Sequence, residues 1–117
     1  MKYIVITNNP MVRDGVSDDI IEYTEADYIG VLKIVRDRIH LGHRLITHPL
    51  AGSVKPGETP YRTVLISKEK GALDEKALFM IEESIETCMK FKAERKYSEK
   101  VLMDFQLIDF SLVFGNK

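Results

Sequence analysis

The chain has 117 residues, a net charge of −1, 44% hydrophobic and 30% charged residues, and one cysteine. This length fits one folded domain, residues 1–117, and a near-zero charge provides no general attraction for nucleic acid or an anionic membrane. A single cysteine excludes a disulfide framework and a cysteine-rich metal site, and it favours a reducing compartment. No run of about 18 apolar residues is present, so we expect a cytoplasmic protein without a membrane span.

The first part of the chain predicts two strands and a helix. Tyr3–Thr7 has apolar residues at adjacent positions, which is typical of a central strand buried on both faces. Residues 11–18 are polar and predict a loop with room for one helical turn, and Ile20–Tyr23 predicts a second strand. Thr24 is the expected N-cap of a helix that ends before Gly42. Its apolar face consists of Tyr28, Val31, Leu32, Val35 and Ile39.

The second part predicts two more strands and two helices. The strands are His43–Thr47 and Arg62–Ser67, and a long helix runs from Asp74 to about Lys96, with Cys88 facing the core. Ser98 can cap another helix, although residues 105–114 also alternate well enough for a strand, so both states stay open there. The apolar face of that last helix would comprise Val101, Leu102, Phe105, Ile108 and Leu112.

This order of elements predicts a small α/β domain. Strands alternating with helices indicate a sheet with helices packed on it. We expect about four strands, mostly parallel, flanked by two or three helices.

The loop from Thr47 to Pro60 is the expected functional surface. His48–Pro60 holds three of the four prolines and two of the seven glycines, so no long helix forms there, and the loop leaves the carboxyl end of a strand. Gly52 and Ser53 offer backbone N–H groups and a hydroxyl, and Lys55 adds a positive charge. The segment lacks the Gly-Lys-Ser/Thr ending of a Walker A loop. It predicts a phosphate or carboxylate at residues 52–55, with a rigid structural crossover as the alternative.

Two asparagines after the first strand extend this candidate site. If the first and third strands run in the same direction, Asn8 and Asn9 lie beside the loop and can hydrogen-bond a ligand; the alternative is a turn that ends the strand. His43 and His48 should point to opposite faces of a strand, so we expect no shared metal ion. The candidate ligand-binding residues are Asn8, Asn9, Thr47, His48, Gly52, Ser53, Lys55 and Thr59.

Six segments spread over nearly the whole chain form a recognisable set. They are Asn8–Pro10, Thr47–Leu50, Gly52–Pro56, Glu58–Tyr61, Ile81–Glu86 and Asp104–Asp109, of which the His-Pro-Leu-x-Gly-Ser block is the most distinctive. In these segments the chain resembles the GrdX family. The resemblance implies a gene neighbour of the glycine, sarcosine or betaine reductase systems of amino-acid-fermenting anaerobes, and it brings no catalytic residues with it.

Three functional hypotheses follow. The first is an accessory or binding protein of the glycine reductase pathway that holds a small anionic metabolite on the loop. The second is an enzyme of that pathway with His48 as general acid or base, although no nucleophile stands beside it. The third is a protein–protein adaptor for the reductase components. The sequence identifies no cofactor, and it leaves a homodimer open.

Overall fold

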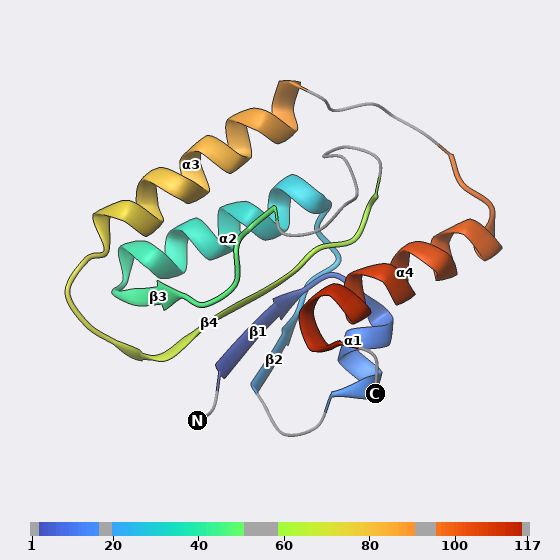
Figure 1. The fold of residues 1–117 in the computed structure, drawn as a ribbon, viewed down its shortest axis with the longest axis horizontal. Coiled ribbons are helices and arrows are strands. Elements are labelled where there is room, and N and C mark those ends of the chain that lie inside the picture. Colours follow the sequence, from blue (N-terminus) through green and yellow to red (C-terminus); the bar gives the residue numbers. More distant parts are fainter. Residues whose placement is uncertain (1–2, 17–19, 51–58, 91–95, 116–117) are drawn as a thin grey trace.

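The structure, a computed structural model, describes residues 3–16, 20–50, 59–90 and 96–115. These residues form four strands and four helices (Figure 1). None of the helices in these segments is both long and apolar enough to cross a membrane. In chain order the elements are β1 (Tyr3–Thr7), α1 (Pro10–Gly15), β2 (Ile20–Tyr23), α2 (Tyr28–His40), β3 (His43–Leu45), β4 (Thr63–Lys70), α3 (Glu75–Lys90) and α4 (Glu99–Phe114).

The four strands form one mixed sheet in the order β2-β1-β4-β3. β1 and β2 are parallel and are connected through α1, whereas β4 runs antiparallel to both β1 and β3. The prediction of about four strands is confirmed, and the prediction of a mostly parallel sheet is wrong. A parallel pair needs a crossover connection, but the described residues between β3 and β4 include no helix, so β4 returns beside β3 in the opposite direction.

Helices cover both faces of the sheet and give the domain three layers. Figure 1 shows α2 and α3 side by side on one face and α1 with α4 on the other. Successive strand residues point to opposite faces, so Ile4 and Ile6 join the core beneath α2 and α3, whereas Val5 joins the core beneath α1 and α4. This arrangement confirms that β1 is a central strand buried on both faces.

Side-chain caps determine where the longer helices begin. The Asp27 carboxylate accepts a hydrogen bond from Gly30 N at 2.7 Å and starts α2. The prediction of Thr24 as this N-cap is wrong by three residues, because Thr24 N donates to Thr7 O at 2.9 Å and continues the pairing of β2 with β1. The predicted cap of α4 is confirmed, since the Ser98 hydroxyl accepts from Val101 N.

Several element boundaries differ from the sequence prediction. Residues 105–114, for which helix and strand were both open, belong to the helix α4. β3 ends at Leu45, two residues early, and β4 continues to Lys70. The described part of α3 runs to Lys90; residues 91–95, within the predicted end of this helix, lie outside the described part, and Lys96 is not helical. Part of the predicted loop over residues 11–18 forms the short helix α1, which Asn9 caps.

Gly42 ends α2 at a close approach between two backbone segments. Its φ of 104° is unfavourable for residues with a side chain, and a Cβ there would lie 2.4 Å from Gly71 O. The carbonyl oxygen of Gly42 also accepts a hydrogen bond from Gly71 N at 2.8 Å. The two glycines therefore join the end of α2 to the turn after β4.

We predict that Gly42→Ala lowers the free energy of unfolding by about 1–3 kcal/mol, because it combines backbone strain with a steric clash. Urea unfolding followed by circular dichroism measures this change. Gly71→Ala is the matched control, since a Cβ at Gly71 meets nothing within 4 Å, and we expect a change within about 0.5 kcal/mol. Equal effects at the two glycines would contradict the steric explanation.

Candidate functional site

The predicted functional loop connects β3 to β4, and only its two ends lie within the described residues. Gly52, Ser53 and Lys55, where the sequence predicts the anion, fall outside them. The described candidate residues form two groups. Asn8, Asn9 and Thr59 lie near the end of β1 and the start of β4, whereas Thr47 and His48 lie beside α3.

Asn8 connects three segments at the carboxyl end of β1. Its side-chain amide donates to Pro60 O at 2.8 Å and to Ala26 O at 3.0 Å, and its Oδ1 accepts from Arg62 N at 2.8 Å. β1 and β3 point in the same direction because both are antiparallel to β4. The prediction that Asn8 lies beside the loop required these two strands to run in the same direction, and they do. Since both amide hydrogens of Asn8 donate to protein carbonyls, this side chain positions the end of the loop.

A buried chain of hydrogen bonds runs from Asn9 through two threonines to Asp109. Asn9 N donates to Thr7 Oγ1 at 3.0 Å, and the hydroxyl oxygens of Thr7 and Thr63 are 2.7 Å apart. Because the Thr63 hydroxyl donates to Asp109 Oδ2 at 2.6 Å, Thr7 is the donor to Thr63. Asn9 Nδ2 also donates to Asp109 at 3.0 Å. The hydrogen bonds of such a chain polarise and strengthen one another, so they favour a single arrangement of these side chains.

Asp109 is the one buried residue of α4, and it faces a buried arginine. Arg62 Nη2 lies 3.7 Å from Asp109 Oδ1, and each side chain is 4% exposed. The carboxylate also accepts the backbone N–H of Thr63 at 3.0 Å. Burial raises the pKa of Tyr28, and that of Cys88 to about 11, while the nearby Arg62 charge opposes both increases. Arg62 thus supplies the positive charge for this interior.

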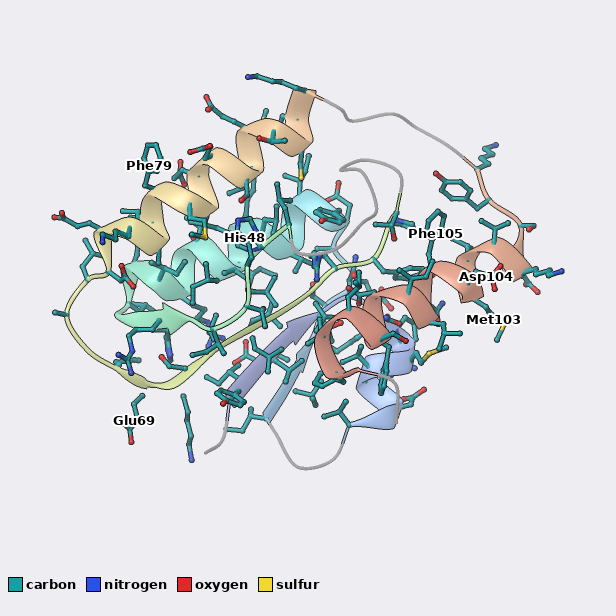
Figure 2. The ribbon with its side chains drawn as sticks, in the orientation of Figure 1. His48, Glu69, Phe79, Met103, Asp104 and Phe105 are labelled. Atoms are coloured by element: carbon teal, nitrogen blue, oxygen red, sulfur yellow. The ribbon has the colours of Figure 1, made fainter. Side chains whose placement is uncertain are left out.

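Two adjoining depressions, of about 580 and 250 Å³, lie between α3 and the segment that follows β3. His48, Lys76 and Met80 line both of them, and Phe79 lines the larger one. Figure 2 shows His48 on the segment that passes beside α3, and Phe79 on α3 itself, where it is 70% exposed. We call these two depressions together the α3 groove. Its other lining residues are Leu45, Ile46, Thr47, Leu50, Asp74, Glu75, Ala77, Glu83, Ser84 and Thr87.

A local hydrogen bond fixes the tautomer of His48 in the α3 groove. His48 Nδ1 accepts from Leu50 N at 2.9 Å. In a neutral imidazole an accepting Nδ1 leaves the proton on Nε2. Neutral His48 therefore offers an N–H donor, rather than a proton acceptor, on its second nitrogen.

The other polar groups of the groove favour binding over nucleophilic chemistry. The ammonium group of Lys76 comes from the first turn of α3, near the positive end of the helix dipole. The hydroxyl of Ser84 donates to Met80 O at 2.8 Å, and that of Thr87 donates to Glu83 O at 2.9 Å. Both hydroxyls thus donate to helix carbonyls, whereas an activated nucleophile donates its proton to a base.

The described segments contain no group of three or more His, Cys, Asp or Glu side chains able to hold a metal ion. His43 is buried with Nδ1 2.7 Å from Ser67 O, whereas His48 lines the α3 groove. The two histidines therefore serve separate parts of the structure.

The predicted site residues do not include Arg62, Asp109 or Lys76. Asp109 is the one acid in the mainly apolar segment 105–114, and an isolated acid there is a signal that the segment contacts a buried polar group. For Arg62 the sequence predicts only that it is the first residue of a strand. Lys76 gives no comparable signal, because a lysine in the first turns of a helix is common on any surface.

We predict that Asp109→Ala lowers the free energy of unfolding by about 3–5 kcal/mol, because it leaves buried donors and the Arg62 charge without their acceptor. Urea unfolding measures the loss. Asp104→Ala removes an exposed acid from the same helix and should change stability by no more than about 0.5 kcal/mol. A similarly small loss at Asp109 would show that its hydrogen bonds contribute little.

We also predict that Cys88 reacts slowly with Ellman's reagent in the folded protein. With a pKa of about 11, only about one thiol in a thousand is ionised at pH 8, and the side chain is 2% exposed. The reaction in urea should be at least roughly a hundredfold faster, since the unfolded thiol regains its usual pKa. Equal rates in the two states would contradict the buried placement.

Comparison with known proteins gives one family. The family model described as GrdX-like protein matches residues 4–116. Searches of curated proteins and of solved structures find no match to this chain. The match covers every described helix and nearly every residue of the four strands, so the chain belongs to the GrdX-like family.

Proposed function

We propose that this protein is an accessory binding protein of a glycine, sarcosine or betaine reductase system, and that it holds a small anionic metabolite in the α3 groove. One observation carries the proposal: the first end of the predicted functional loop, through Thr47, His48 and Leu50, lines this groove. Thr47 and His48 contribute to its wall together with Lys76, the one lysine among the described lining residues.

The dimensions of the groove fit a small molecule. Ligand sites commonly measure about 300–1,000 Å³ and combine apolar walls with a few polar groups. Leu50, Phe79 and Met80 provide an apolar wall. His48 and Lys76 line both depressions, so an anionic group belongs where the two depressions meet, and the apolar part of the ligand belongs against Phe79.

The negative charges of the groove support this position for the anion. Glu75 and Glu83 line only the larger depression, away from the junction. Asp74 lines the smaller one, but its carboxylate accepts a hydrogen bond from Ala77 N at 3.1 Å as a helix cap. Gly52, Ser53 and Lys55 follow His48 in the chain by four to seven residues, and we propose that they add donors from the loop.

The groove supports a binding protein better than an enzyme. A general base at His48 would have to use Nε2, which carries the proton in the neutral ring because Nδ1 accepts from Leu50 N. A believable catalytic site needs more than one group in a defined role. The hydroxyls of Ser84 and Thr87 donate to helix carbonyls instead of facing a base.

We predict that inorganic phosphate, acetyl phosphate or acetate shifts the NMR amide signals of residues 47–55 and 74–77 at millimolar concentration. His48→Ala and Lys76→Gln should each weaken binding by roughly tenfold, the effect of one lost charge-assisted hydrogen bond. Lys33→Gln is the matched control, because Lys33 is exposed on α2 and lines neither depression.

Amides 47–55 and 74–77 that stay unmoved in the folded protein would contradict the anion site. The exposed Phe79 would then make the groove a surface for a protein partner. Retention of reductase components on the immobilised wild-type protein, with loss on Phe79→Ser, would establish that adaptor role instead.

A further inference from the structure

α4 has an unusual distribution of polar and apolar residues. Its one buried residue is the acid Asp109, while five large apolar side chains on the same helix are 37–59% exposed. A helix that is apolar on all sides is normally buried on all sides. Here only one side packs against the domain, through Phe110, Val113 and Phe114. The exposed residues are Val101, Met103, Leu107, Ile108 and Leu112.

One stripe of α4 forms a continuous apolar surface. Val101, Phe105, Ile108 and Leu112 follow each other at intervals of four, three and four residues, which places them on one side of a helix. Phe105, Ile108 and Leu112 also border a hollow beside the start of β4, together with Tyr28, Thr59 and Tyr61. We call these four residues the α4 stripe.

We propose that the α4 stripe is a homodimer interface in which two copies of α4 pack antiparallel across a two-fold axis. The intervals of four, three and four are the same in both directions along the helix. In an antiparallel pair, Val101 of one copy therefore lies opposite Leu112 of the other, and Phe105 lies opposite Ile108. A two-fold interface requires this kind of self-complementary surface. The proposal is independent of ligand binding in the α3 groove.

The exposed area suits a dimer of modest size. The lower end of specific interfaces takes about 600 Å² from each partner, and a little over half of it is apolar. Val101, Ile108 and Leu112 of the α4 stripe are 37–42% exposed, so they can contribute apolar surface to such an interface. Because buried area alone does not set the affinity, the association has to be measured over a wide range of concentrations.

The charges near the ends of α4 favour the antiparallel direction. The last turn of α4 carries no basic residue to complement the negative end of its dipole. Lys96 and Lys100 lie exposed at its start. Antiparallel packing brings these two lysines of one copy towards the carboxyl end of α4 in the other copy, and parallel packing does not.

Sedimentation velocity between about 1 and 200 µM tests the association. The wild type should shift from the 13.4 kDa mass of one chain towards twice that mass. Ile108→Glu, with Ile108 39% exposed, should stay at the single-chain mass. Met103→Glu is the matched control on the same helix, since Figure 2 shows Met103 and Phe105 on opposite sides of α4. It should associate like the wild type.

A wild type that stays monomeric at 200 µM overturns the proposal, and so does an Ile108→Glu variant that dimerises normally. Circular dichroism checks that each variant is folded. If Ile108→Glu does not fold, oxidative crosslinking decides instead. The double variant Val101→Cys/Leu112→Cys should form a covalent dimer, whereas either single variant should not, and the buried Cys88 stays silent. Efficient crosslinking of Val101→Cys alone overturns the antiparallel arrangement.

Discussion

Hydrogen bonds to the Asp109 carboxylate fix how α4, near the C-terminus, packs against the first strand–helix connection and the start of β4. The carboxylate receives hydrogen bonds from Thr63 at the start of β4 and from Asn9 at the start of α1, and it faces Arg62. Taking a carboxylate out of water is costly unless its lone pairs are satisfied, and here several donors converge on it. α4 is therefore positioned on the sheet by this polar contact together with the packing of Phe110, Val113 and Phe114, while five of its large apolar side chains stay exposed.

The same end of the sheet shapes the candidate site. The Asn8 side-chain amide donates to Pro60 O at the end of the loop, and Asn8 Oδ1 accepts a hydrogen bond from the backbone N–H of Arg62. The loop thus leaves β3 beside α3 and returns to β4 at a point that hydrogen bonds define. For the proposed binding surface, a loop end fixed in this way reduces the conformational entropy that would be lost on binding a ligand.

Local patterns predicted most of the helices and strands, and long-range contacts account for what they missed. The apolar run of β1 and the face of α2 each depend on neighbours a few residues away, so their periodicity is visible in the sequence. The direction of β4 depends on how the chain returns after β3, and the role of Asp109 depends on partners 46 and 100 residues away. The sequence predicted only one side of the α3 groove. His48 belongs to a loop with a distinctive composition, whereas Lys76 lies on an ordinary helix surface.

The outer strands of the sheet limit how copies of this protein can associate. β3 has three residues and an irregular register against β4, and β2 has four residues, none of them buried. Such short edges present few backbone groups in line for a further strand to pair with. Continuing the sheet from one molecule into the next would therefore gain few hydrogen bonds, and the edges of the sheet are poor surfaces for association.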